Sequence, residues 1–214
     1  MISSKFTRNP WSRVIIINGT QPKQAQVSIR ESDVYNNPGP YSGQNGGFGR
    51  AIVCRNSTTL IDHCTIKGNK ALVIISTFLG GGNAGLDIGS SNVTLNDTLI
   101  EGNEALYVPA IFITQNSTVM INRCTIAKNH ALRILYNGMY IGGADAGIAI
   151  GNSGIFNLKE GTVITRNTAK NYSAIDNSEL GIVNIQEGVH IFNNHDEHQP
   201  CRPIHSEGIL NDAR

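Results

Sequence analysis

The sequence predicts an all-β protein, a right-handed parallel β-helix: a solenoid of about six or seven rungs with long loops inserted in alternate rungs. Three observations lead to this fold class. The 214 residues include 23 glycines but only 15% charged and 6% aromatic residues, which is typical of tight-turned β structure. A short segment recurs along the chain. No stretch has the sustained helical periodicity of the crossovers that normally connect parallel strands.

The recurring segment has the two-residue period of a β-strand. Each copy reads apolar, any, apolar, a polar corner, and then an Ile or Val followed by a closing Asn. The first four copies align without gaps, and the last two carry a Glu-Gly corner. The copies span residues 27–37, 59–69, 93–103, 119–129, 158–167 and 185–194. Stacked rungs about 4.8 Å apart would form one inward column from Ile66, Ile100, Ile126, Ile164 and Ile191, and a second from Ile29, Ile61, Leu95, Ile121, Leu158 and Ile185.

The closing asparagines are predicted to form a structural ladder, because stacked amides can bond from rung to rung at a tight turn. The ladder residues are Asn37, Asn69, Asn103, Asn129, Asn167 and Asn194.

A further strand in each rung follows glycine-rich stretches, at residues 49–54, 84–89, 109–114 and 146–151. No linker interrupts the repeat. The sequence therefore predicts one β-helix domain over residues 11–194, an N-terminal extension over 1–10, and a polar C-terminal tail or cap over 195–214.

Two glycine motifs, GGGNAG at 81–86 and GGADAG at 142–147, accompany the hydrophobic-x-x-Asn element. This pairing resembles the repeats of the polymorphic outer membrane proteins, whose patterns are GGA-[ILV] and Phe-x-x-Asn, with Ile or Val here in place of Phe. The resemblance implies a β-helix and an adhesin-like role at the cell surface.

Charge and hydropathy exclude some partners. The net charge is +1, and no basic cluster interleaved with aromatic residues is present, so nucleic acid is not expected as a partner. The apolar run from Val14 to Ile17 is too short for the core of a signal peptide or for a membrane span. We therefore expect no membrane insertion. No cofactor is expected either. The expected location is extracellular or at the cell surface, although no signal peptide is visible in the chain.

Cysteines and histidines suggest two different roles. Cys64 and Cys124 fall two rungs apart, beyond the reach of a disulfide, so they are predicted to be buried free thiols, with Cys54 also directed inward. The C-terminal histidines and cysteine have a spacing that could supply four zinc ligands, the alternative being a polar tail folded over the last rung. The metal candidates are His195, His198, Cys201 and His205.

Six N-x-S/T sequons are candidate N-glycosylation sites, although turn-rich composition also produces such triplets. They lie at Asn18, Asn56, Asn92, Asn96, Asn116 and Asn171.

One corner column holds a candidate catalytic cluster of Asp62, His63, Asp97 and Arg123. Carboxylates and basic groups aligned on neighbouring rungs are what a polysaccharide lyase, a glycoside hydrolase or a uronate epimerase of the β-helix type requires. The alternative is a column of alternating charges that merely avoids like-charge stacking.

The loops at 71–82 and 131–143 are unusually apolar. They either cover the helix or form an interface for a protein partner or for self-association, with a glycan as a further ligand class. The candidate contact residues are Leu72, Ile74, Ile75, Phe78, Leu79, Leu132, Ile134, Leu135, Tyr136, Met139 and Tyr140. The favoured function is therefore a non-enzymatic extracellular or surface β-helix for structure and adhesion. The alternatives are a polysaccharide-acting enzyme and a structural component of a virus particle or an extracellular filament.

Overall fold

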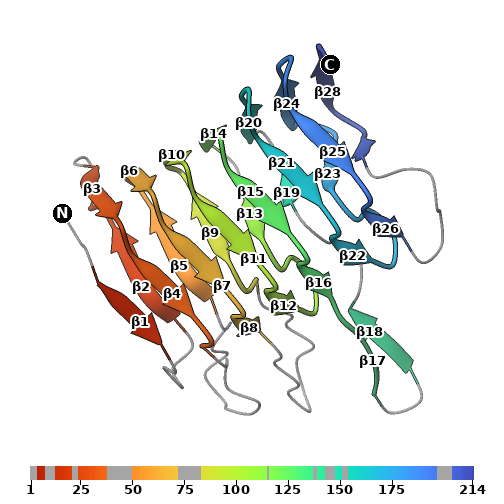
Figure 1. Cartoon of the computed structure of the whole chain (residues 1–214), viewed down its shortest axis with the longest axis horizontal. Coiled ribbons are helices and arrows are strands. Elements are labelled where there is room, and N and C mark those ends of the chain that lie inside the picture. The colour runs from red at the N-terminus through yellow and green to blue at the C-terminus, as the bar shows by residue number, and fades with distance from the viewer. Residues whose placement is uncertain are drawn as a thin grey trace.

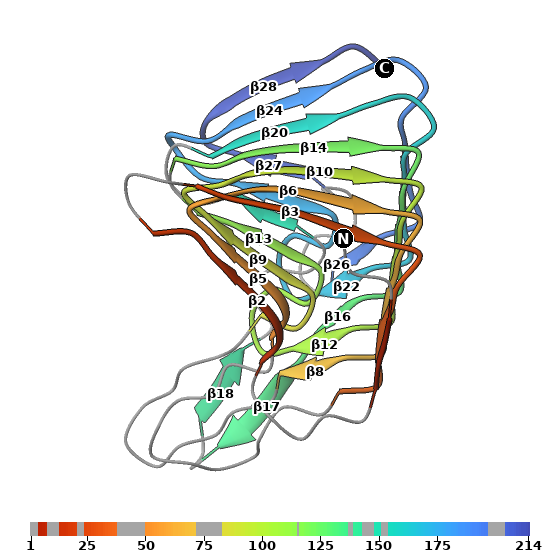
Figure 2. The same cartoon turned by 90° about the vertical axis from the view of Figure 1, so that its left-hand side faces the viewer.

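The computed structural model describes residues 4–7, 13–20, 24–37, 50–71, 83–114, 116–136, 139–142, 148–150, 154–196 and 204–214. These residues form β-strands, turns and bends, with no helix among them (Figures 1 and 2). Accordingly, nothing in these ranges provides a helix with the length and apolar character needed to cross a bilayer. The predicted all-β class is confirmed.

Four parallel sheets contain nearly all the strands. Sheet A consists of β3 (Ala25–Arg30), β6 (Ser57–Asp62), β10 (Asn92–Asn96), β14 (Thr118–Asn122), β20 (Ile155–Leu158), β24 (Ile182–Ile185) and β28 (Ile209–Asp212). Sheet B consists of β1 (Lys5–Thr7), β4 (Asp33–Tyr35), β7 (Thr65–Lys67), β11 (Leu99–Glu101), β15 (Thr125–Ala127), β21 (Val163–Thr165) and β25 (His190–Phe192). Sheet C consists of β2 (Arg13–Asn18), β5 (Arg50–Arg55), β9 (Leu86–Gly89), β13 (Ile111–Ile113), β19 (Ile148–Ile150), β23 (Ile175–Asn177) and β27 (Ile204–Ser206). Sheet D consists of β8 (Lys70–Ala71), β12 (Glu104–Ala105), β16 (His130–Ala131), β22 (Thr168–Ala169) and β26 (His195–Asp196).

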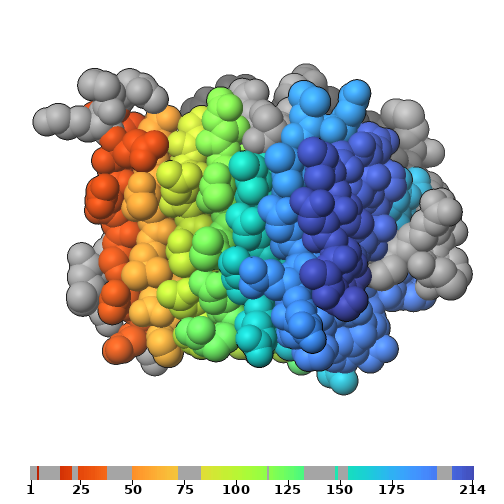
Figure 3. All heavy atoms as spheres, turned by 90° about the horizontal axis from the view of Figure 1, so that it is seen from above, coloured from red at the N-terminus to blue at the C-terminus, as the bar shows by residue number. Residues whose placement is uncertain are grey.

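From β5 onward the chain passes through the sheets in a fixed order, C, A, B and D, and then enters sheet C again. We call each such passage a rung. Neighbouring strands in a sheet therefore come from successive rungs, and they pair in parallel, as β6 with β10 and β10 with β14. Figure 3 shows the strands of sheet A side by side across one face, from β3 to β28. One antiparallel hairpin, β17 (Arg133–Tyr136) with β18 (Met139–Gly142), is inserted between β16 and β19.

The apolar residues of the repeat align in the core as the sequence predicts. In sheet A the strand register places Ile61, Leu95 and Ile121 directly opposite one another, and in sheet B it does the same for Ile66, Ile100 and Ile126. All six side chains are fully buried. Strand alternation explains this, because every second residue of a rung faces the interior and stacks on its counterpart in the next rung.

Buried asparagines join the rungs where sheet B ends. The Nδ2 atoms of Asn37, Asn69, Asn103, Asn129 and Asn167 each donate to Oδ1 of the next asparagine, at 2.9 Å in every case. The last acceptor is Asn194. Each acceptor oxygen also receives the backbone N–H of the preceding asparagine, as in the 3.0 Å bond from Asn69 N to Asn103 Oδ1. The ladder thereby satisfies polar groups that would otherwise be buried without partners.

Left-handed residues make the corner between sheets A and B. Glu31, His63, Asp97 and Arg123 have φ values of 46°, 51°, 46° and 48°. This conformation is unusual for residues with a Cβ atom, and it ends one strand and redirects the chain within a single residue. In the two following rungs Gly161 and Gly188 take the positive φ instead. The positive-φ residues of successive rungs therefore form one column along this corner.

Parallel strands also occur outside the predicted domain of residues 11–194. Strand β1 pairs with β4, and β26, β27 and β28 pair with β22, β23 and β24. Residues 204–214, which the sequence analysis assigned to a tail or cap, therefore add strands to sheets C and A.

Candidate functional site

The corner between sheets A and B brings the candidate catalytic residues together. His63 Nδ1 lies 3.0 Å from Asp62 Oδ1, and His63 Nε2 lies 4.0 Å from Asp97 Oδ2. Arg123, one rung further on, donates from Nε and a terminal nitrogen to the two oxygens of Asp97, at 2.8 and 2.6 Å. We call these four residues the corner cluster.

The arginine favours the ionised form of Asp97. Its two hydrogen bonds to Asp97 hold the pKa of that carboxyl below its usual value. The same pair raises the pKa of the Arg123 guanidinium. A general acid needs the opposite shift, because it must keep its proton near neutral pH. In this arrangement Asp97 is an ionised partner of Arg123 near neutral pH.

A metal ion has to compete with the same arginine. Asp62, His63 and Asp97 each offer one ligand atom, and these atoms lie within 4.8 Å of one another. Both oxygens of Asp97, however, already accept hydrogen bonds from Arg123. A cation would have to displace a bidentate guanidinium, which is among the stronger partners of a carboxylate.

Another charged column repeats this pattern on sheet B. Glu101 lies between two lysines of neighbouring rungs, 2.6 Å from Lys128 Nζ and 2.5 Å from Lys67 Nζ. Hydrogen bonds from Lys128 and Lys67 lower the pKa of Glu101. In both columns, cationic side chains from neighbouring rungs therefore form ion pairs with the ionised carboxylates of Asp97 and Glu101.

Sequence reasoning missed a buried charged group on sheet C. Asp87 on β9 is fully buried, with Arg50 Nε 2.6 Å and an Arg55 terminal nitrogen 2.7 Å from its oxygens. The strand register sets Asp87 beside Val53 on β5, between the two arginines of that strand. An aspartate in such a column requires a cationic neighbour.

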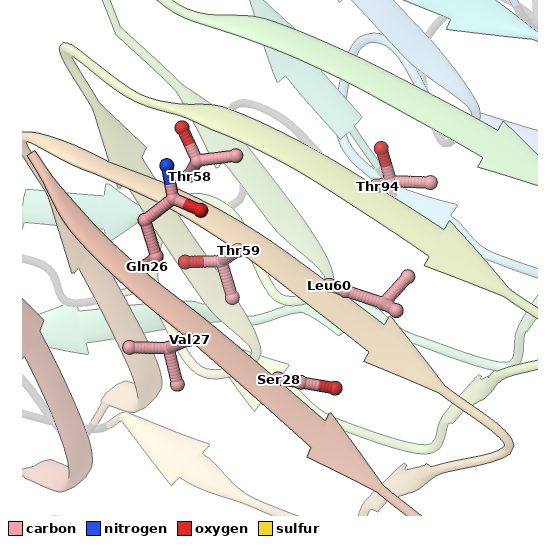
Figure 4. Close-up of a pocket in the computed structure, with 7 residues that line it drawn as sticks. All are labelled: Gln26, Val27, Ser28, Thr58, Thr59, Leu60 and Thr94. Carbon is pink, nitrogen blue, oxygen red and sulfur yellow. The ribbon is translucent and has the colours of Figure 1, made fainter. Parts of the chain in front are cut away.

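The outer face of sheet A has a shallow depression of about 440 Å³ that is lined by uncharged side chains (Figure 4). Strand alternation places Gln26, Thr58 and Thr94 on the outer face and directs Thr59 to the other side of the sheet, as Figure 4 shows. The depression offers hydroxyl and amide groups without a carboxylate or a cation. It has the chemistry for hydrogen bonding to a neutral ligand and none for acid–base catalysis.

The apolar loops are only partly described. Leu72, Ile74, Ile75, Phe78 and Leu79 lie outside the described residues. Leu132 is half-buried. The other candidates of the second loop lie in the hairpin β17–β18, in which Leu135 pairs with Tyr140, Tyr136 with Met139 and Ile134 with Ile141. Figures 1 and 2 both show this hairpin standing away from the four sheets.

The described candidates for zinc ligation lie on different sheets. His195 is exposed on β26 of sheet D. His205 lies on β27 of sheet C, where its Nδ1 is 2.8 Å from Asp176 Oδ1 and its ring stacks on Tyr172 with centroids 4.1 Å apart. His198 and Cys201 lie outside the described residues. Within the described ranges, the corner cluster contains the one group of three ligand-bearing side chains close enough for a shared ion.

The sequons differ in accessibility. Asn18, Asn92 and Asn116 are exposed, whereas Asn56, Asn96 and Asn171 are half-buried. Asn96 Oδ1 also accepts a 2.7 Å hydrogen bond from Asn122 Nδ2. Exposure therefore favours the first three as acceptors.

The three described cysteines, Cys54, Cys64 and Cys124, are free and buried, as predicted. Burial raises the pKa of Cys54 and of Cys124 to about 11, and it also raises the pKa of Cys64. These thiols stay protonated at neutral pH and act as small core residues.

Comparison with known proteins gives no match to this chain among family models, curated proteins or solved structures.

Proposed function

We propose that this chain is a right-handed parallel β-helix with a non-enzymatic role in structure and adhesion at the cell surface or outside the cell. Parallel strands joined by crossovers are right-handed in about 98% of cases, which supports the handedness. The fixed order of sheets, C, A, B and D, supports a coil in which each rung is one turn. The likeness of the glycine motifs to polymorphic outer membrane protein repeats supports the surface location.

The observation that carries the proposal is the hairpin β17–β18. It stands away from the stacked sheets, and apart from Arg133 its sequence is apolar on both strands, with Leu135 opposite Tyr140 and Tyr136 opposite Met139. A two-stranded hairpin is at best marginally stable alone in water, and a projecting apolar segment is typical of an interaction site. We infer that the hairpin binds a protein partner. The experiment below tests a second copy of this chain as that partner.

The electrostatics of the corner cluster support a role without catalysis. Asp97, the carboxylate closest to His63 from the next rung, is bonded on both oxygens to Arg123. The charges of this column bind one another and stabilise the stack, and Arg123 holds the pKa of Asp97 below its usual value.

The double variant Leu135→Ser/Tyr140→Ser tests the interface. We expect the wild type to associate as its concentration rises, as followed by light scattering, and the double variant to remain monomeric with an unchanged melting temperature. Phe192→Ser is the matched control, since Phe192 is an exposed aromatic residue (48%) elsewhere on the surface, and it should associate like the wild type. A melting temperature several degrees lower, with association unchanged, would assign the hairpin a structural role and refute the proposal.

A further inference from the structure

A column of left-handed residues follows the strands of sheet B, where the chain turns toward sheet D. Glycine and asparagine adopt this conformation more readily than most residues. Lys128 and Arg166, with φ values of 55° and 57°, occupy the column in two successive rungs. The column consists of Asn36, Gly68, Gly102, Lys128, Arg166 and Asn193. The backbone conformation therefore does not explain why two of these positions hold basic side chains.

Two lysines share a single carboxylate at this corner. The Glu101 carboxylate lies between the Lys67 and Lys128 ammonium groups, 2.5 and 2.6 Å away. The Glu101 side chain is only 14% exposed, whereas those of Lys67 and Lys128 are 53% and 54% exposed. One mostly covered carboxylate thus balances two exposed cations, which leaves a net positive charge at the surface of the corner.

Arg166 adds a third cation without a carboxylate to balance it. Lys128 N donates to Thr165 O at 3.2 Å, which sets Arg166 beside Lys128 in the next rung, about 4.8 Å away. Within the described residues the exposed Arg166 side chain forms no hydrogen bond and no ion pair, whereas Arg123 at the corner between sheets A and B is paired with Asp97. Because like charges on neighbouring strands repel each other, an external anion bound here would reduce a repulsion that the described residues leave unbalanced.

The neighbouring positions on sheet D do not balance these cations. The outward positions closest in sequence to the corner are His130 and Thr168. Glu104, one rung before His130, is already paired with Lys70 at 2.8 Å. We call the three exposed cations the basic edge: Lys67, Lys128 and Arg166. This edge presents positive charge along the stack, from rung to rung.

We propose that the basic edge binds an anionic polysaccharide that lies along the stack. A polymer with repeated negative charges can contact all three cations at once, and several weak exposed contacts then add up to measurable affinity. Nucleic acid is the less suitable polyanion, because its binding depends on many simultaneous phosphate contacts and three cations are few. The choice of a polysaccharide also rests on the proposed function, which places the chain at the cell surface or outside the cell. The basic edge includes no residue of the hairpin β17–β18.

Charge reversal at the basic edge tests this inference. The probes are immobilised dextran sulfate and dextran, which share one polysaccharide backbone and differ in the sulfate groups. We expect the wild type to bind dextran sulfate at low salt, to bind it less as the salt concentration rises, and not to bind dextran. Arg166→Glu should weaken binding to dextran sulfate by about tenfold, as measured by biolayer interferometry.

Lys159→Glu is the matched control, because it changes the net charge by the same amount at a different corner. Lys159 follows β20 at the corner between sheets A and B, and within the described residues its side chain also has no hydrogen-bond or ion-pair partner. This variant should bind dextran sulfate like the wild type. Circular dichroism establishes that each variant is folded. Should Arg166→Glu not fold, Arg166→Gln takes its place, with an expected loss of about threefold.

The proposal is overturned if the wild type does not bind dextran sulfate or binds dextran equally well. It is also overturned if Arg166→Glu and Lys159→Glu weaken binding equally, since net charge alone would then attract the polymer. Tighter binding of single-stranded DNA than of dextran sulfate would assign the edge to nucleic acid instead. The loss caused by Arg166→Glu should be the same in the Leu135→Ser/Tyr140→Ser background, so that a failure of the hairpin interface and a failure of polysaccharide binding are told apart.

Discussion

Single amide side chains connect the rungs inside the molecule. Asn129 is fully buried, and its Nδ2 donates to Asn167 Oδ1 at 2.9 Å and to Ile100 O at 3.1 Å. Its Oδ1 accepts the backbone N and the Nδ2 of Asn103, at 3.1 and 2.9 Å. One side chain thus satisfies groups in the rungs before and after its own.

Asn129→Ala should therefore be strongly destabilising. Leaving several buried groups without partners should lower the free energy of unfolding by about 3 kcal/mol, or the melting temperature by roughly 6–12 °C for a chain of this size. Thermal denaturation followed by circular dichroism measures the change. Asn211→Ala is the control, because Asn211 is exposed and donates one side-chain bond to Asn184, and its loss should change stability by less than about 1 kcal/mol. Equal effects of the two substitutions would show that the buried ladder contributes no more to the free energy of unfolding than an exposed amide hydrogen bond.

The ion pair of the corner cluster should give a pH-dependent contribution to stability. Arg123 lowers the pKa of Asp97 below the unfolded value of 3.8. The pair therefore stabilises the fold above that pH, and its contribution is lost as pH falls through the folded pKa. Arg123→Gln should lower the melting temperature slightly at neutral pH, and this difference should shrink as the pH falls below 3.8. The neutral-pH difference should also shrink in high salt, since the pair is exposed. A difference that does not shrink in acid would indicate that Arg123 acts through packing instead.

Among the elements, the corners decide where each strand ends. Gly188 has a φ of 78°, and a Cβ atom there would lie 2.7 Å from Glu160 Cγ. Gly102, at the corner between sheets B and D, has a φ of 62° with no atom within 4 Å of such a Cβ position. The two glycines separate the effect of backbone conformation from that of crowding.

Gly102→Ala should lower the free energy of unfolding by about 1 kcal/mol, the ordinary effect of a Cβ atom in the left-handed region. Gly188→Ala should lower it by about 2 kcal/mol, because Glu160 must also move. Chemical denaturation with urea gives both values on one scale. A Gly188→Ala variant as stable as Gly102→Ala would show that the Glu160 side chain moves away freely.

For the molecule as a whole, the stacking was predictable because it follows from strand period alone. The alignment of residues 27–37, 59–69, 93–103 and 119–129 gives the register of Ile61 with Leu95 and of Ile66 with Ile100, since each copy repeats the same in-and-out pattern. The corner cluster followed from the same alignment. The bidentate geometry of Arg123 on Asp97 did not, because side-chain rotamers at an exposed corner are set by neighbours and not by period.

What the sequence analysis missed lies where the repeat is broken. The strands of sheet D are only two residues long. They are too short to show a strand period in the sequence, so sheet D was not predicted. Strands β27 and β28 follow a polar stretch that reads as a tail, and their pairing with β23 and β24 depends on contacts with the preceding rung. To predict the buried ion pairs of Asp87, its position would have to be compared with those of Arg50 and Arg55 on the neighbouring strand.

The asparagine ladder also has a direction. In each of its five amide–amide bonds, Nδ2 donates toward the C-terminal end of the stack and Oδ1 accepts from the N-terminal side. The six amides are thus dipoles aligned head to tail along the long axis, and each polarises the next in the low-dielectric interior. A ladder cut in the middle becomes two shorter chains of dipoles, whereas a ladder cut at Asn37 loses only its first member. The same amide is therefore a stronger donor at the centre of the stack than at its end, although every link has the same length.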